Sequence, residues 1–232
     1  MMRLRTAFFA MALVLLTAQA FAAGALDRRI DAATEVLEQM TKMPEQGVPS
    51  HLLSSAYAVA VIPNVIKAGF MLGGSYGEGV LVVRQPDGRW SNPAFINIGA
   101  ASIGWQVGAQ SSDIVLVFKS RKGVDRIERG KLTLGGDANI AAGPVGRSTS
   151  AATDGQLKAE IYSYARNRGL FAGISLQGAW LRMDNKANFA YYDSGQGTPA
   201  QILSDSHLPT PAHARRFIEV LAARTPSLQW QT

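Results

Sequence analysis

The alternation of apolar and polar positions divides the chain into helical ends and a long, strand-like middle. In residues 25–43 the apolar positions recur at spacings of three and four and form one stripe: Leu26, Ile30, Ala33, Leu37 and Met40. This spacing predicts an amphipathic helix, which Pro44 and the Gly-Val-Pro turn at 47–49 would end. A second short helix is predicted from Ser50 to Ser55, and residues 211–224 again show helical spacing.

Residues 56–192 have the pattern of β-strands broken by turns. Strands are predicted at 57–62, 69–84, 94–98, 102–109, 113–119, 131–134, 138–142, 157–167, 169–183 and 187–192, with a helical turn at 124–129. The spacing of apolar residues in 157–167 fits either a helix or a strand, and the tyrosines of this segment favour a strand. Nineteen of the 23 glycines lie between Gly69 and Gly178, although glycine is normally depleted in strands. Such strands must bend sharply, pack backbone against backbone, or admit something close to the backbone.

These patterns predict one α+β domain over residues 23–232. Its sheet would be strongly curved, glycine-rich and mainly antiparallel, or closed into a barrel, with helices at both ends of the sequence. A mature chain of about 210 residues is long enough to bury roughly 70% of its unfolded surface.

The first 22 residues have the pattern of a signal peptide. Arg3 and Arg5 form a basic start, residues 7–18 are apolar, and residues 20–22 fit an A-x-A motif that predicts cleavage between Ala22 and Ala23. A cut two residues earlier also fits. The alternative is an uncleaved membrane anchor. About 12 apolar residues are too few to span a bilayer, which takes about 20, so the length favours a cleaved signal peptide. Because no cysteine follows the cleavage site, we expect an unlipidated periplasmic protein, soluble or peripheral at a membrane.

The composition excludes several classes of function. The chain has no cysteine, which excludes thiol chemistry, and its three histidines lack metal-ligand spacing, so no metal or cofactor is predicted. Of the net charge of +6, residues 1–22 contribute +2. Residues 119–131 hold six basic and two acidic residues and so carry the other +4. Such a local excess argues against nucleic acid as a partner.

Several segments, in order along the chain, resemble the SYLF domain family. They include A-V-A-V-I-P-N-V-I-K-A-G-F at 58–70, G-G-S-Y-G-E-G-V-L-V-V-R at 73–84 and D-G-R-W-S-N-P-A-F-I at 87–96. They continue with G-W-Q-V-G-A-Q-S-S-D-I-V-L-V at 104–117, L-G-G-D-A-N-I-A-A-G-P-V-G-R at 134–147, Y-S-Y-A-R-N-R-G-L-F-A-G-I-S-L-Q-G at 162–178 and N-F-A-Y-Y at 188–192. The resemblance covers roughly residues 25–192, and residues 199–225 would form a helical extension.

The resemblance implies a lipid- or membrane-binding module, and the residues themselves lead us to expect no enzyme. Eukaryotic members of the family bind phosphoinositides and in some cases actin, and their membrane binding is ascribed partly to an N-terminal amphipathic helix. Export would keep this chain away from actin, so we expect anionic phospholipid or lipopolysaccharide as its partner. The sequence predicts no oligomeric state.

Two surfaces are predicted to contact the membrane. The helix at 25–43 would insert Leu26, Ile30, Leu37 and Met40; packing of this stripe on the sheet is the alternative. The lipid-binding cations would be Arg28, Arg29, Lys67, Lys119, Arg121, Lys122, Arg126, Arg129, Lys131 and Arg147. An ordinary solvated face is the alternative for residues 119–131. At about 1 kcal/mol per cation, a net +4 gives roughly 4 kcal/mol, or millimolar affinity, so apolar insertion would have to add to it.

Two glycine motifs are further candidates for chemistry. Gly143 and Gly146, beside Arg147, could form an anion-binding nest, with a tight turn as the alternative. Residues 73–77 match G-x-S-x-G, which would make Ser75 a hydrolase nucleophile. That motif needs a helix directly after the serine, whereas here the pattern continues as a strand. Two functions other than membrane binding stay open. The second is a carrier that holds an apolar ligand inside the curved sheet, and the third is a serine hydrolase.

Overall fold

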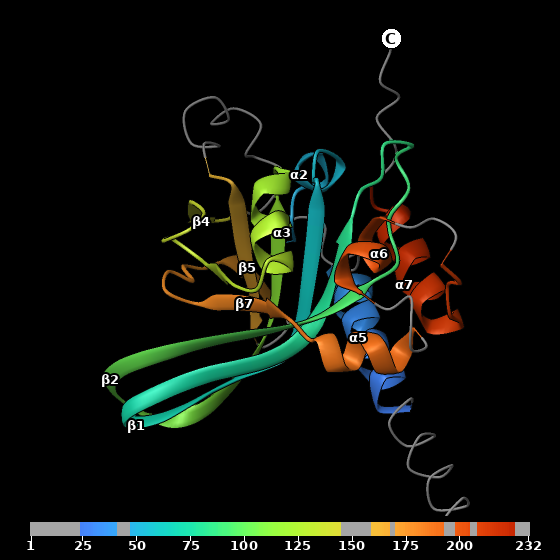
Figure 1. The fold of residues 1–232 in the computed structure, drawn as a ribbon. Coiled ribbons are helices and arrows are strands. Elements are labelled where there is room, and N and C mark those ends of the chain that lie inside the picture. The colour runs from blue at the N-terminus through green and yellow to red at the C-terminus, as the bar shows by residue number, and fades with distance from the viewer. Residues whose placement is uncertain are drawn as a thin grey trace, which may run out of the picture.

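The computed structural model describes residues 24–40, 47–144, 159–167, 170–192, 198–204 and 208–225. Its central feature is a long antiparallel ribbon of β1 (Ala58–Val83) and β2 (Ala94–Phe118). The two strands pair from Ala58–Phe118 to Leu81–Ala94, and their register shifts twice, between Ile62 and Val65 and between Gly69 and Met71. Figure 1 shows the ribbon bending in its middle, where it reaches away from the rest of the molecule.

The bend brings the two halves of β1 against each other, and glycine makes the contact possible. A Cβ at Gly79 would meet the carbonyl oxygen of Val61 and would lie 2.7 Å from the Cα of Ile62. A Cβ at Gly77 would lie 2.6 Å from a methyl carbon of Val65. Real Cβ atoms do not approach backbone this closely, so only glycine fits. Of the three alternatives for glycine-rich strands, the structure shows sharp bending and close backbone packing.

Five further strands complete a seven-stranded sheet with the order β3-β7-β2-β5-β4, in which β1 pairs with β2 and β6 pairs with β5. They are β3 (Leu132–Thr133), β4 (Ile140–Ala142), β5 (Ile161–Asn167), β6 (Leu170–Gly173) and β7 (Trp180–Met183). Among the strand pairs of the described residues, only β4–β5 is parallel. The predicted class, α+β with a strongly curved and mainly antiparallel sheet, is therefore confirmed.

Strand boundaries differ from the predicted ones at three places. The strands predicted at 94–98, 102–109 and 113–119 are one continuous strand, β2. The strand predicted to stop at residue 62 continues through a bulge, because Asn64 adopts a left-handed φ of 51° and its N–H donates to Asp113 Oδ1 at 2.9 Å. Residues 169–183 contain two strands, β6 and β7, separated by a turn in which Gly178 has a φ of 80°.

The strand predicted at 187–192 is wrong, because residues 187–191 lie in helix α5 (Asn185–Tyr191) and Tyr192 is its C-cap residue. Asp184 caps this helix: its Oδ1 accepts a hydrogen bond from the Ala187 N–H at 3.1 Å. A capping aspartate satisfies one of the unpaired N–H groups of the first turn and so favours a helix start. The Asn188 side chain accepts a hydrogen bond from the Phe95 N–H and donates one to the Phe95 carbonyl oxygen, which attaches α5 to β2.

The remaining helices flank the ribbon. They are an N-terminal helix at residues 24–40, α2 (Ser50–Ser54), α3 (Arg121–Glu128), α6 (Pro199–Ser204) and α7 (Ala212–Ala222). The N-terminal helix lies between β2 and α7: Arg29 contacts the backbone of Ile96, and Glu38 pairs with Arg216 at 2.9 Å. Buried side chains of these helices and of the sheet form one apolar core. Among the described residues no helix has the length and hydropathy needed to cross a bilayer.

Candidate functional site: a basic face and a groove on either side of helix α3

Helix α3 divides the basic segment 119–131 between two surfaces. Val124 and Ile127 are buried and hold the helix on the sheet. On one side, Lys122, Arg126, Arg129 and Lys131 line a shallow surface hollow of about 510 Å³ together with Asp125. We call these four cations the basic face. On the other side, Lys119 and Arg121 line a deeper groove. The predicted basic patch is therefore divided between two surfaces, which share Asp125.

Two cations of the basic face are fixed by carboxylates. Lys122 Nζ lies 2.8 Å from Glu160 Oε1, and Arg126 Nη1 lies 3.1 Å from Asp137 Oδ1. Asp137 also accepts the Thr133 N–H, and these contacts hold its pKa below the usual value. Within the described residues no ion pair is found for Arg129 or Lys131, and both side chains are exposed. The two cations of this face that are not held in an ion pair among the described residues therefore lie just beyond the C-terminal end of α3.

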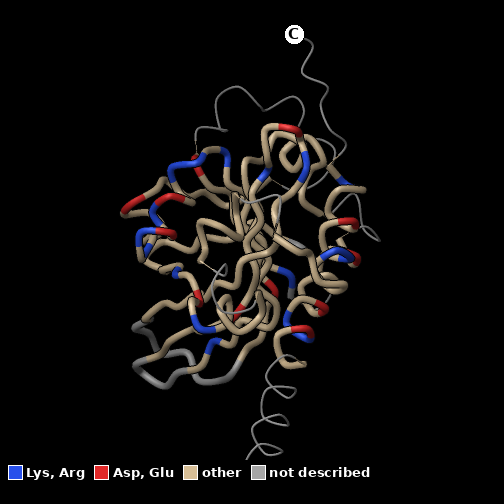
Figure 2. Tube along the Cα trace, turned by 45° about the vertical axis from the view of Figure 1, so that its right-hand side comes forward, with Lys and Arg blue, Asp and Glu red and all other residues tan. Residues whose placement is uncertain are grey.

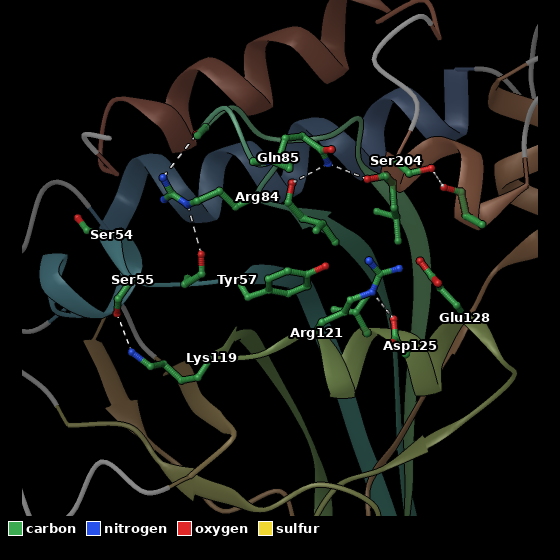
Figure 3. A pocket seen from close by; sticks show the side chains of 17 residues that line it. Ser54, Ser55, Tyr57, Arg84, Gln85, Lys119, Arg121, Asp125, Glu128 and Ser204 are labelled. Carbon is green, nitrogen blue, oxygen red and sulfur yellow. Dashed lines mark hydrogen bonds and ion pairs between the residues drawn. The ribbon is translucent and has the colours of Figure 1, made fainter. Parts of the chain in front are cut away.

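The groove has a volume of about 690 Å³ and lies where α2, α3, α6 and both ends of β1 meet (Figure 3). Its apolar lining comes from Tyr57, Val83, Pro86, Val124 and Leu203, among others. In Figure 3 the Tyr57 ring lies in the middle, with Lys119 and Ser55 on one side and Asp125 and Glu128 on the other. Segments about 150 residues apart in the sequence thus line one groove.

The Lys119 end of the groove is cationic. Lys119 Nζ donates to Ser55 Oγ at 2.7 Å, and partial burial lowers the pKa of the lysine. Arg84 lies over the Trp90 ring, 4.4 Å from its centroid, and donates to the carbonyl oxygens of Leu53, Ala56 and Gly88. Burial lowers the pKa of Arg84 as well. Neither cation has a carboxylate partner among the described residues.

The opposite end is acidic. Arg121 Nε lies 2.8 Å from Asp125 Oδ1 and neutralises that carboxylate. Burial, and then the neighbouring Asp125, raise the pKa of Glu128. Sequence analysis did not find this groove, because its Arg84, Tyr57 and Leu203 come from distant segments and belong to no local motif.

Residues 99–224 match the family model of Ysc84, which is described as a Las17-binding protein actin regulator. The chain belongs to this family. An SH3 domain-containing YSC84-like protein 1 of Rattus norvegicus is 34% identical over 199 residues, covering 83% of this chain and 58% of the relative. Protein YSC84 of Saccharomyces cerevisiae is 33% identical over 183 residues, 78% of this chain and 38% of the relative. The chain thus spans little more than half, or less, of these relatives.

The Ysc84 family includes the SYLF domains, so the predicted family is confirmed. Helix α3, the basic face and the groove-lining part of α6 all lie within the matched segment 99–224. The β1 strand, which contains Ser75, and Arg84 directly after it precede that segment.

Arg29, predicted as a lipid-binding cation, is instead part of the interior of this Ysc84-family fold. Its side chain is 8% exposed and pairs with Asp184 at 2.9 Å. It also donates to Asn97 Oδ1 at 3.0 Å and to the carbonyl oxygen of Ile96. The prediction that Arg29 lies on a lipid-contacting surface is therefore wrong in this structure, because the helix turns it toward β2.

The apolar stripe of the N-terminal helix packs on the protein core. Ile30 and Leu37 are fully buried, Met40 is 3% exposed, and Leu26 packs against the same cluster. The structure thus shows the alternative considered for this stripe, packing on the sheet. Insertion of these four side chains into a membrane would require the helix to leave its site.

The other predicted residues are scattered. Arg28 is exposed on the N-terminal helix, and Lys67 is exposed on β1 opposite Gln110. Gly143 gives its N–H to the carbonyl oxygen of Ser163 at 3.0 Å, so that N–H is not available to an anion, which contradicts the nest at this residue. A Cβ there would also overlap the Tyr164 ring. Gly146, Arg147, Ala22 and Ala23 lie outside the described residues.

The Ser75 motif lacks the context of a hydrolase. Ser75 lies within β1, paired with Ala100, and the strand continues to Val83 without the helix that a nucleophile elbow requires. In the described part of the chain no cluster of three or more His, Asp or Glu side chains could hold a metal ion. The inside of the curved sheet is occupied by core side chains over the described residues, where the carrier hypothesis would place an apolar ligand.

Proposed function

We propose that the chain is a non-enzymatic membrane-binding module that contacts anionic lipid through the basic face of α3. The observation that supports this proposal is the grouping of Lys122, Arg126, Arg129 and Lys131 on one exposed surface, two of them without an ion-pair partner in the described residues. Membership of the Ysc84 family supports it further, because the resemblance to the SYLF domain family implies a lipid- or membrane-binding module. Phosphate headgroups are the anions that such a surface would meet on a membrane.

The contact would be weak and sensitive to salt. Each cation near an anionic membrane contributes about 1 kcal/mol, so four give at most about 4 kcal/mol, or roughly millimolar affinity. Glu160 and Asp137 already offset two of the cations, which lowers that value further. Because the Debye length is about 8 Å at physiological ionic strength, added salt would screen most of the remaining attraction. The module would therefore bind reversibly and be assisted by other contacts or by several copies.

The signal-peptide pattern belongs to this proposal. Cleavage near Ala22 and Ala23 would release the chain into the periplasm, where it would meet anionic phospholipid or lipopolysaccharide. The family description refers to Las17 and actin, but export would separate this chain from cytoskeletal partners. N-terminal sequencing of the protein purified from its cell envelope tests this part: a start at or next to Ala23 supports export, and an intact Met1 contradicts it.

Cosedimentation with vesicles tests the membrane contact. We expect binding to phosphatidylcholine vesicles to rise as phosphatidylglycerol is added, and to fall as salt is raised at fixed lipid composition. Binding that is equal for neutral and anionic vesicles, or that salt leaves unchanged, would contradict an electrostatic contact. No sedimentation with any anionic lipid would remove the proposal.

A further inference from the structure

The groove beside α3 has the size and build of a small-molecule site. Its volume of about 690 Å³ falls within the range of roughly 300–1,000 Å³ typical of ligand pockets. One wall is held together by Arg84, which follows β1 and whose guanidinium donates to carbonyl oxygens of Leu53 in α2, of Ala56 and of Gly88 in the turn. This groove lies on the other side of α3 from the basic face.

Charge inside the groove is separated along its length. Arg84 and Lys119 are partly buried cations without carboxylate partners among the described residues, and Ser55 places a hydroxyl 2.7 Å from the lysine nitrogen. Partly buried charge without a counter-charge is costly, and an anionic group from a ligand would supply the missing partner. At the far end, the groove-lining cation Arg121 is already paired with Asp125, so the described residues of this end offer a second anionic group no cation that is not in an ion pair.

Between the two ends the walls are mainly apolar. The Tyr57 ring lies between the Lys119 end and the Glu128 end, as Figure 3 shows, and Val83 and Leu203 contribute further apolar surface. A purely ionic ligand would leave these apolar walls exposed to water. An apolar body would add about 25 cal/mol of favourable binding free energy for each Å² of apolar surface that it covers. The lining therefore favours a ligand that combines one anionic group with an apolar body.

We propose that the groove binds a single-headed amphiphilic anion, in which one phosphate monoester or carboxylate is attached to an apolar chain or ring. The anionic group lies against Lys119 and the Ser55 hydroxyl, and the apolar body extends over Tyr57 toward α6. A free amphiphile and the headgroup region of a membrane lipid share this chemistry. The inference does not depend on the basic face, which is a separate surface.

Calorimetric titration with decyl phosphate, kept below its micellar concentration, tests the site. We expect saturable one-to-one binding, with inorganic phosphate and decanol each binding at least tenfold more weakly. Lys119→Gln should weaken decyl phosphate binding by about tenfold or more, because it removes a hydrogen bond to a charged group. Ala200→Trp, at an exposed position on the groove wall, should weaken it by filling the groove.

Matched controls lie on the exposed side of α5: Lys186→Gln and Ala190→Trp should leave the titration unchanged. Absence of saturable binding, equal binding of inorganic phosphate, or binding that neither groove variant alters would overturn the proposal. Vesicle cosedimentation of the groove variants identifies the source of the ligand. Unchanged vesicle binding points to a free amphiphile, and reduced vesicle binding points to a membrane lipid. Variants of the basic face should lose vesicle binding and still bind decyl phosphate. That result would show that the groove and the basic face act independently.

Discussion

At the scale of single residues, Arg29 shows how a cation can belong to the fold and not to the surface. It is buried between the N-terminal helix and β2, and its charge is balanced by Asp184, with Glu78 at 3.6 Å. The same Asp184 caps α5. One arginine therefore connects the N-terminal helix, the β1–β2 ribbon and α5. In the sequence it is indistinguishable from its neighbour Arg28, which is exposed.

Replacing Arg29 with methionine should destabilise the protein. The change leaves the Asp184 carboxylate without its buried partner, and breaking such a pair typically costs about 3–5 kcal/mol. Because Asp184 is 20% exposed, we expect a value near the lower end of that range. Urea unfolding followed by circular dichroism measures it, with Arg28→Met as the control at an exposed position. A loss below that of the control would contradict the structural role of Arg29.

His213 predicts a pH dependence of stability. Its Nδ1 lies 2.7 Å from Asp31 Oδ1 on the N-terminal helix, and Asp27 is also close, so the pKa of His213 is raised although Arg216 opposes the shift. A raised folded-state pKa means that the contribution is fully present below the unfolded value of about 6.5. It is lost as pH rises through the higher folded-state pKa.

His213→Gln should therefore lower the free energy of unfolding at pH 5.5 and leave it nearly unchanged at pH 9. The pair is partly exposed, so the effect at low pH should not exceed about 1 kcal/mol. Chemical denaturation of both proteins at the two pH values checks this difference. An equal loss at both pH values would show that packing, and not charge, is responsible.

At the scale of elements, the bent ribbon explains where sequence analysis succeeded and where it failed. The density of glycine predicted curvature, because glycine in a strand has few other uses, and the residue spacing predicted both end helices. The continuity of β2 was missed, since glycine and serine within 99–112 resemble turns when no partner strand is known. Helix α5 was missed because its aromatic residues favour strands, and the Asp184 cap outweighs that preference.

Gly79→Ala tests the closeness of the bend. Its added Cβ would meet the backbone of Val61 and Ile62, which cannot move without separating the halves of β1. Overpacking usually costs about 1–3 kcal/mol, and we expect the upper end here, because backbone yields less than a side chain. Gly136→Ala is the control, since a Cβ there makes only ordinary contact with Thr133 at 3.5 Å. If the two variants unfold at the same denaturant concentration, the close contact is wrong.

The candidate sites were only partly predictable for a similar reason. The basic segment 119–131 is contiguous, so its charge is visible in the sequence. Which cations face outward depends on the orientation of α3, which is set by Val124 and Ile127 packing on the sheet. The groove needs Arg84, Tyr57 and Lys119 to come together through tertiary pairing, and no local signal indicates that.

At the scale of the whole molecule, the proposed membrane contact depends on how charge is distributed over the surface. Figure 2 shows cations and acidic residues interspersed over most of the described trace, and many of them form pairs. A mature protein with a net charge of +4, which is +6 less the +2 of residues 1–22, is attracted to any anionic surface to some extent. If one face makes a specific contact, removing cations from that face should weaken vesicle binding more than removing the same number of cations elsewhere.

The most direct test of the membrane-binding proposal is vesicle cosedimentation of the double variant Arg129→Ala/Lys131→Ala at low salt. The control is the variant Lys186→Ala/Arg215→Ala, which removes the same charge from α5 and α7. Loss of two cations at the membrane contact should cost about 2 kcal/mol, or roughly 30-fold in affinity for anionic vesicles. The control should change affinity much less. Equal weakening of both variants, or no weakening of the first, would contradict a membrane contact through the basic face.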